Sequence, residues 1–214
     1  MPTPETLIAF FGVSILLAFS PGPDNVFVLL QSIRHGARAG IAVVVGLCAG
    51  LVVHTAAVAL GLAAVFASSP VAFTALKYCG AAYLAYLAWQ AWRAPVTQAD
   101  TGVAPAAQRM DGRALRRMSA RGMLMSLTNP KLLIFFLAFL PQFADPARGS
   151  LAPQILVLGG VFMLAAFLVF GAMACFSGAF GRVLQRSANA QRWLNRVTSL
   201  VFVGLALRLA SLQR

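Results

Sequence analysis

Charged residues are scarce in this sequence, and acidic residues are the scarcest of all. Only 5 of the 214 residues are Asp or Glu, and all charged residues together make up 10%, against about 25% in an ordinary soluble domain. Hydrophobic residues make up 60%. A soluble fold of this length could not bury so much apolar surface, so the composition excludes that class and predicts one compact membrane domain.

Motifs for catalysis, metal binding and disulfide formation are also absent from the sequence. The three cysteines, Cys48, Cys79 and Cys175, each lie in an apolar stretch and share no CxxC or Cys/His spacing. There is no H-E-x-x-H, no G-x-S-x-G and no Walker A motif. We therefore expect neither an enzyme, nor an ATP-driven pump, nor a bound metal or cofactor.

Basic residues outnumber acidic ones by 17 to 5, which gives a formal net charge of +12. In a soluble protein this excess would suggest nucleic-acid binding. Here the basic residues occupy short segments between apolar runs, which indicates orientation signals instead. By the positive-inside rule the richer side is cytoplasmic, so both termini are predicted to face outside. The residues predicted on that side are Arg34, Arg38, Arg93, Arg109, Arg113, Arg116, Arg117, Arg121, Arg182, Arg186, Arg192 and Arg196.

Six apolar stretches can be counted, and each reaches or approaches the roughly 20 residues that a helix needs to cross about 30 Å of hydrocarbon. Strands would be about half as long and would alternate polar and apolar residues. The sequence therefore predicts an all-α integral membrane protein with six transmembrane helices. The stretches are residues 7–32, 40–66, 70–92, 122–143, 151–180 and 193–212.

The stretch 94–112 is the clearest linker, because it is rich in Ala, Pro, Thr, Gln and Gly. It divides the chain into two halves of three helices, and an odd number per half requires repeated halves to be inverted in the membrane. We predict a first three-helix repeat at 1–93, a cytoplasmic linker at 94–121 and a second repeat at 122–214. A weak similarity at an offset of 119 supports the repeat: Lys77, Gly80, Tyr83 and Leu84 correspond to Arg196, Ser199, Phe202 and Val203.

Two prolines, a glycine and an acid interrupt the first apolar stretch, in the segment Pro21-Gly22-Pro23-Asp24-Asn25. The prolines remove amide donors and disfavour helix at the preceding residue, which frees backbone carbonyls inside the membrane. Asn25 or Asp24 can cap the helix that restarts here, and its positive N-terminal end would stabilise the carboxylate of an amino acid. The alternative is a proline kink that serves packing alone.

The fourth apolar stretch is broken in a similar way. Asn129 can donate and accept hydrogen bonds where Pro130 leaves a carbonyl open, and Ser126 adds a hydroxyl. Breaks at corresponding places in two halves are the best sequence indication of a transporter site. We hypothesise that Asp24 and Lys131 pair across the repeat interface. The alternative is that the long side chain of Lys131 reaches the cytoplasmic surface.

Two features of the second apolar stretch each have two interpretations. His54 lies in mid-helix, and because imidazole can change charge near neutral pH, it joins Asp24 as a candidate for carrying a coupling proton. The alternative is a hydrogen-bonded packing residue. Gly46 and Gly50 form a small-xxx-small pair, which allows close helix contact either within the monomer or between subunits.

The first break, together with Asn129-Pro130-Lys131 leading into the segment 137–143, resembles the two signature segments of the LysE/RhtB family of amino-acid exporters. The resemblance covers nearly the whole chain apart from the linker. It implies an exporter of amino acids or close derivatives in the bacterial cytoplasmic (inner) membrane, driven by protons, and it suggests a homodimer. The family's motif residues fall on Pro21, Gly22, Pro23, Asp24, Asn25, Asn129, Pro130 and Lys131.

The predicted mechanism is alternating access of the two inverted repeats. The helix ends at Asn25 and Asn129 would hold the substrate carboxylate, Asp24 would meet the amino group or the proton, and Lys131 would balance charge. Membrane lipids are expected around the protein, and no nucleic acid. A channel or another solute carrier that uses Asp24 for a cation remains an alternative, and so does a structural membrane protein with no transport cycle.

Overall fold

The fold is helical throughout the part of the chain that the computed structural model describes, which is residues 1–20, 22–68, 70–94, 110–177 and 188–211. The helices are α1 Pro4–Phe19, α2 Pro23–His35, α3 Ala37–Ser68, α4 Pro70–Arg93, α5 Gly112–Thr128, α6 Pro130–Ile134, the π-helix η1 Phe135–Phe139, the 3-10 helices η2 Leu140–Phe143 and η3 Pro146–Arg148, α7 Leu151–Cys175 and α9 Ala188–Ser211. The all-α prediction is confirmed for these residues, which contain no strand.

Two helices, α3 and α7, are by themselves long and apolar enough to cross a membrane. The candidate spans are Ala37–Gly61 and Leu151–Cys175. Two broken pairs also qualify when each is taken as one span: α1 with α2, bent by 63°, and α5 with α6 to η2, bent by 53°. Within the described residues this gives up to four spans. For α4 and α9, which have 24 residues each, crossing the membrane stays a prediction.

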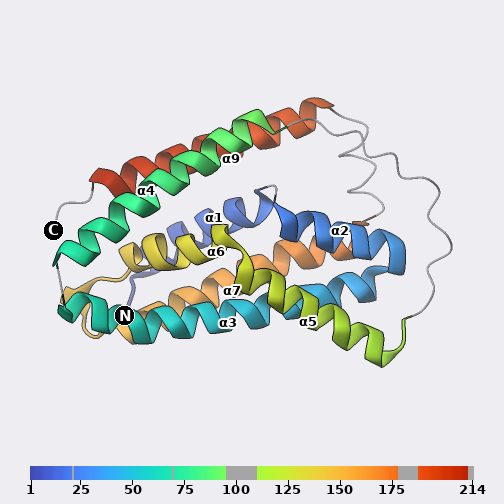
Figure 1. Ribbon diagram of the computed structural model, residues 1–214, viewed down its shortest axis with the longest axis horizontal. Coiled ribbons are helices and arrows are strands. Elements are labelled where there is room, and N and C mark those ends of the chain that lie inside the picture. The colour runs from blue at the N-terminus through green and yellow to red at the C-terminus, as the bar shows by residue number, and fades with distance from the viewer. Residues whose placement is uncertain (21, 69, 95–109, 178–187, 212–214) are drawn as a thin grey trace.

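The helices run along one long axis (Figure 1). Their direction alternates along the chain when α1 with α2, and α5 with α6, are each taken as one broken helix. α3 packs against α5 and α7, and α1 packs against α7. α4 and α9 lie side by side along one flank of this bundle (Figure 1). α1 begins and α9 ends at the same end of the molecule, as the prediction of six crossings requires (Figure 1).

Both breaks occur where the prolines predict them. α1 ends at Phe19, Gly22 stands before α2 in an extended conformation with φ −169°, and Pro23 is the first residue of α2. In the second half, α5 ends at Thr128 and Pro130 is the first residue of α6. Proline is accepted at a first helical position because its missing N–H would have no partner there. The prediction that the first and fourth helices are broken is thus confirmed. The predicted cap by Asn25 or Asp24 is wrong, because Gly22 is the N-cap of α2 and no side chain caps its first turn.

The fourth helix begins about ten residues earlier than the apolar stretch 122–143. α5 starts at Gly112, because the Asp111 Oδ1 accepts a hydrogen bond of 2.7 Å from the Ala114 amide and caps the first turn. Its first turns carry four arginines and fall inside the predicted linker 94–121. Hydropathy identifies only the apolar part of this helix, whereas arginine is a good helix former, so the helix can begin before its apolar part.

Small residues let α3 and α5 approach closely. A Cβ atom added at Gly46 would collide with the backbone oxygen of Ser119, and one added at Gly50 would lie 2.6 Å from the Ser126 hydroxyl. On the facing helix, a Cβ at Gly122 would collide with the Val43 backbone oxygen. Of the two alternatives for the Gly46–Gly50 pair, the structure therefore shows contact within the monomer.

The last part of the predicted apolar stretch 122–143 changes its winding after α6. Pro141 has no N–H and its ring would clash with an α-helical carbonyl four residues earlier, so the α-helix cannot continue here. The chain instead forms a π-helix and then a 3-10 helix. Phe135, Phe136 and Phe139 of this segment are fully buried. The Phe135 ring contacts those of Phe10, Phe139 and Phe162, and the Phe136 ring meets that of Phe162 edge to face.

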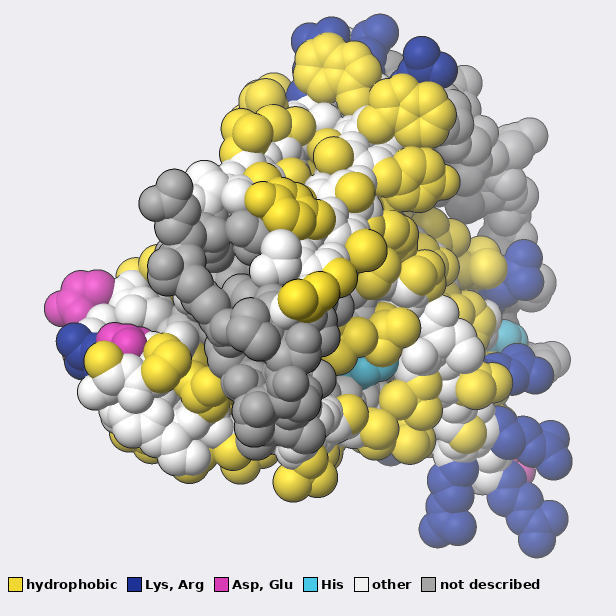
Figure 2. Space-filling view, turned by 60° about the vertical axis from the view of Figure 1, so that its left-hand side comes forward, with side chains coloured by type: hydrophobic (Ala, Val, Ile, Leu, Met, Phe, Trp, Pro, Cys, Tyr) yellow, Lys and Arg dark blue, Asp and Glu magenta, His cyan; other side chains and the backbone are white. Residues whose placement is uncertain are grey.

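Charge divides between the two ends of the molecule. Figure 2 shows most Lys and Arg side chains on the right, and a small group of acidic side chains with one basic side chain on the left. Hydrophobic side chains cover much of the face between them, which suits contact with lipid (Figure 2). The ion pair Arg148–Asp145, 3.4 Å, lies beside the N-terminus, whose ammonium donates a hydrogen bond of 3.2 Å to the Arg148 carbonyl.

Candidate functional site

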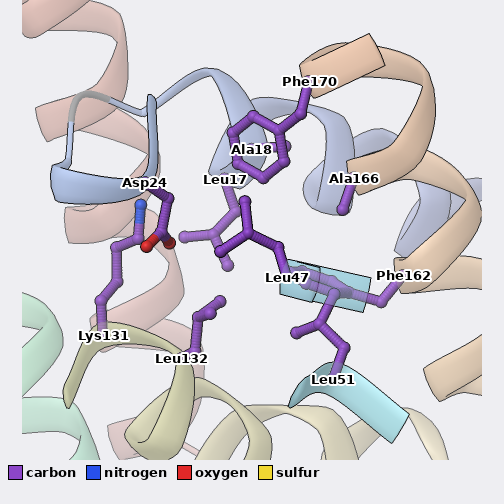
Figure 3. Close-up of a pocket in the computed structure, with 10 residues that line it drawn as sticks. All are labelled: Leu17, Ala18, Asp24, Leu47, Leu51, Lys131, Leu132, Phe162, Ala166 and Phe170. Atoms are coloured by element: carbon purple, nitrogen blue, oxygen red, sulfur yellow. The ribbon is translucent and has the colours of Figure 1, made fainter. Parts of the chain in front are cut away.

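The two resumed helices place an acid and a base at equivalent positions. Asp24 follows Pro23 at the start of α2, and Lys131 follows Pro130 at the start of α6. Both side chains are buried, with exposed fractions of 1% and 7%. Figure 3 shows them pointing toward each other from the two helices. Because a buried charge is costly without a partner, this opposition is the natural centre of a site.

Asn129 connects the two charged residues. Its Nδ2 donates a hydrogen bond of 2.6 Å to the Asp24 Oδ2, and its Oδ1 accepts one of 3.0 Å from the Lys131 backbone N–H. The second bond caps α6. One side chain therefore closes the break in the second half and also holds the acid of the first half.

Side chains donate hydrogen bonds to backbone carbonyls at the first break. Asn25 Nδ2 donates to the Ala18 carbonyl at 2.8 Å, and Lys131 Nζ donates to the Ser20 carbonyl at 3.4 Å. A Cβ on Gly22 would lie 3.2 Å from Lys131 Nζ. Glycine at this position thus leaves room for the ammonium group to approach the broken backbone.

The hypothesis of an Asp24–Lys131 pair needs refinement. The structure places no ion pair within 4.0 Å between these two described residues, although their side chains face each other (Figure 3). Asn129 mediates between them instead. The alternative for Lys131 fails, because a side chain that is 7% exposed and bonded to Ser20 does not reach the surface.

Three buried polar atoms of the site have no hydrogen-bond partner in the described part of the chain. They are Asp24 Oδ1, Asn25 Oδ1 and Ser126 Oγ. Leaving such a group unpaired costs about 1–3 kcal/mol. At the two breaks, two acceptors and one hydroxyl are therefore free to bind a polar ligand.

The side chain of His54, on α3, contacts the C-terminal end of α5. Its Nε2 is 3.1 Å from the Ser126 carbonyl oxygen, and its ring is 5.7 Å from that of Phe136. Since a carbonyl only accepts, this bond requires a proton on Nε2. The contact supports the packing interpretation of His54, because the ring bonds to the Ser126 carbonyl at the end of the helix, which also accepts a hydrogen bond of 3.2 Å from the Asn129 backbone N–H. The role in proton coupling stays a prediction.

A small cavity adjoins Asp24 and Lys131, at the junction of the two halves of the chain. Its volume of about 10 Å³ is close to the least that holds one water molecule. The other lining residues, which the sequence analysis missed, are Leu17, Ala18, Leu47, Leu51, Leu132, Phe162, Ala166 and Phe170 (Figure 3). Their spacing of four on α3 and α7 gives each set one helix face, but an apolar helix carries no signal of which face is inside.

The model of the LysE type translocator family matches residues 15–213. The chain belongs to the LysE type translocator family. This translocator is 32% identical over 205 residues to a leucine efflux protein of Enterobacter sp. (strain 638), covering 95% of this chain and 92% of the relative. No solved structure matches it.

Two further relatives cover nearly the whole translocator. A homoserine/homoserine lactone efflux protein of Salmonella typhimurium is 32% identical over 207 residues, covering 97% of each chain. An uncharacterized membrane protein of Vibrio cholerae is 34% identical over 207 residues, covering 95% of this chain and 96% of the relative. As a member of a translocator family, the protein is a membrane transporter and not an enzyme.

Most predicted site residues of the translocator come together in space. Gly22, Asp24, Asn25, Ser126, Asn129 and Lys131 meet at the two breaks. Pro23 and Pro130 begin the resumed helices. Pro21 lies outside the described residues. Ser20 was not among the predicted site residues, although its backbone carbonyl accepts a hydrogen bond from Lys131 Nζ.

Proposed function

We propose that this translocator exports amino acids from the cytoplasm in exchange for protons. The observation that carries the proposal is the buried opposition of Asp24 and Lys131, each at the start of a resumed helix. Two relatives, a leucine efflux protein and a homoserine/homoserine lactone efflux protein, support an amino acid as the substrate.

The site offers a counter-charge for each end of a zwitterion. The Lys131 ammonium would bind the α-carboxylate, since Nζ has one weak bond of 3.4 Å and further N–H donors. The Asp24 carboxylate would bind the α-ammonium through Oδ1, the oxygen that Asn129 leaves free. Asn25 Oδ1 and Ser126 Oγ would add hydrogen bonds around the same groups.

Proton coupling would follow from competition at Asp24. A carboxylate that binds a proton no longer attracts an ammonium group, so substrate and proton would occupy Asp24 in turn. Release of the amino acid outside would be followed by protonation of Asp24, and loss of that proton inside would restore the site. His54 remains a second candidate for the coupling proton, acting through the end of α5.

Alternating access of two inverted three-helix repeats, residues 1–93 and 122–214, would carry the site from side to side. Corresponding helices run in opposite directions (Figure 1). The helix contacts also follow the repeat. The contact of α3 with α5 corresponds to that of α7 with α1. The equivalent helices α3 and α7 pack against each other, and so do α4 and α9. The cavity of about 10 Å³ cannot hold an amino acid, so this conformation is closed.

We place the protein in the bacterial cytoplasmic membrane, with the arginine-rich end inside and both termini outside. The large excess of basic residues at one end supports this orientation (Figure 2). Export would then move the substrate from the end where α2 meets α3 toward the end where α1 begins.

Efflux from loaded cells tests the proposal. Cells that express the protein are loaded with labelled amino acids, and release is followed with and without an uncoupler. We expect uncoupler-sensitive release that is lost in Asp24→Asn, while the control Asp145→Asn, at a half-exposed side chain, keeps it. Absence of release from abundant protein in the membrane would contradict an amino-acid exporter, and release that ignores the uncoupler would contradict proton coupling.

A further inference from the structure

The cavity beside the charged pair has one polar end and one apolar end. Figure 3 shows Asp24 and Lys131 on one side, and Leu47, Leu51 and Phe162 extending away from them. Apart from the two charged residues, every side chain that lines the cavity is a hydrocarbon. A substrate bound by its charged groups at the polar end would therefore direct its side chain into this apolar end.

The polar end is balanced in charge. Among the buried residues that the structure describes, Asp24 is the one acid, and Lys131 is the one lysine or arginine. The ammonium and carboxylate of an amino acid would use both. A basic or acidic substrate side chain would then have no counter-charge in the cavity, and an unpaired charge in apolar surroundings is strongly unfavourable.

The apolar end is built from both halves of the protein. Leu47 and Leu51 are four residues apart on α3, and Phe162 and Ala166 are four residues apart on α7, so each pair shares a helix face. All four have exposed fractions of 2% or less. When the halves separate to admit a substrate, these are the surfaces that its side chain would meet.

We infer that the exported amino acids are neutral ones with an apolar side chain. This inference rests on the proposed function and narrows it. Burial of one methylene group is favourable by an amount that corresponds to about a fourfold change in affinity. The apparent affinity should therefore rise from alanine through valine to leucine, and charged amino acids should compete poorly.

A competition assay tests the inference on the full-length protein in cells. Release of labelled leucine is measured against internal alanine, valine, isoleucine, lysine and glutamate. Inhibition by the apolar amino acids, at least tenfold stronger than by lysine or glutamate, supports the inference. Export of lysine or glutamate as fast as leucine would overturn it and leave the exporter intact. Export of no amino acid would overturn both.

Ala166→Leu tests whether this cavity is where the side chain lies. The larger residue would fill the apolar end, so the preference for leucine over alanine should fall at least fourfold. The matched control is Ala57→Leu on the exposed face of α3, which should keep the preference of the unaltered protein. An unchanged preference in a well-expressed Ala166→Leu would overturn the assignment, and Ala166→Val gives a milder change if that protein folds poorly.

Discussion

At the scale of single residues, the site depends on side chains that each perform two tasks. Asn129 caps α6 with its oxygen and holds Asp24 with its nitrogen. Lys131 bonds the Ser20 carbonyl and faces Asp24. One side chain can thus serve both a freed carbonyl and a buried charge, which both need partners inside a membrane. It also means that the charges at positions 24 and 131 depend on each other.

A charge exchange tests that dependence. Asp24→Lys or Lys131→Asp alone leaves buried charges of one sign, which we expect to cost about 3–5 kcal/mol of stability and to abolish export. The double variant restores an opposite pair at the same two positions, so it should be more stable than either single variant and regain some export. Thermal unfolding in detergent and efflux measure the two quantities. Strictly additive losses would contradict electrostatic coupling between the two residues.

At the scale of helices, the close packing of α3 on α5 positions the second break. Gly50 of α3 lies against Ser126, whose carbonyl is bonded by His54 of the same α3. A larger separation of these two helices would move Ser126 and Asn129 away from the partners they contact in the first half. The small residues of α3 are therefore part of the structural support of the site.

Replacing two glycines of α3 by alanine separates packing from helix propensity. Alanine favours a helix over glycine by about 1 kcal/mol, so Gly61→Ala, where nothing lies within 4 Å of the added Cβ, should be neutral or stabilising. Gly50→Ala, whose Cβ would lie 2.6 Å from Ser126 Oγ, should destabilise by about 1–3 kcal/mol and lower export. Equal midpoints of thermal unfolding for both variants would show that the contact carries no energy.

At the scale of the whole molecule, the two ends differ in charge and the two halves run in opposite directions. α5, whose first turns carry four arginines, begins at one end (Figure 1). At the other end, where α1 begins, the Met1 ammonium donates to the Arg148 carbonyl, and Arg148 pairs with Asp145. By the positive-inside rule, the excess of arginine at one end predicts that this end lies on the cytoplasmic side of the membrane.

Thiol labelling checks this orientation. In a background without Cys48, Cys79 and Cys175, single cysteines are introduced by Arg116→Cys and Asp145→Cys, both at exposed positions. A membrane-impermeant reagent should label position 145 in intact cells, and position 116 only after the cells are permeabilised. The opposite pattern would place the arginine-rich end outside and reverse the proposed direction of export.

The breaks in the helices could be predicted from the sequence, but the start of α5 and the contacts between helices could not. The positions of the broken helices followed from Pro23 and Pro130, because a missing amide acts locally. The start of α5 could not be predicted in this way, because hydropathy scores the arginines of its first turns as polar and therefore places them outside the apolar stretch. The direct Asp24–Lys131 contact was replaced by an arrangement through Asn129, since hydrogen bonds between distant segments depend on how the helices cross.

By itself, the sequence determined the properties that arise from composition and from neighbouring residues. These are the membrane class, from the 60% hydrophobic content, and the polar breaks and the charged residues next to them. The tertiary structure decided which surfaces meet. It turned Gly46 and Gly50 toward α5, aligned His54 with Ser126, and selected Leu47, Leu51 and Phe162 for the cavity. The physical reason is that lipid and protein interior are both apolar, so hydropathy cannot tell the two faces of a membrane helix apart.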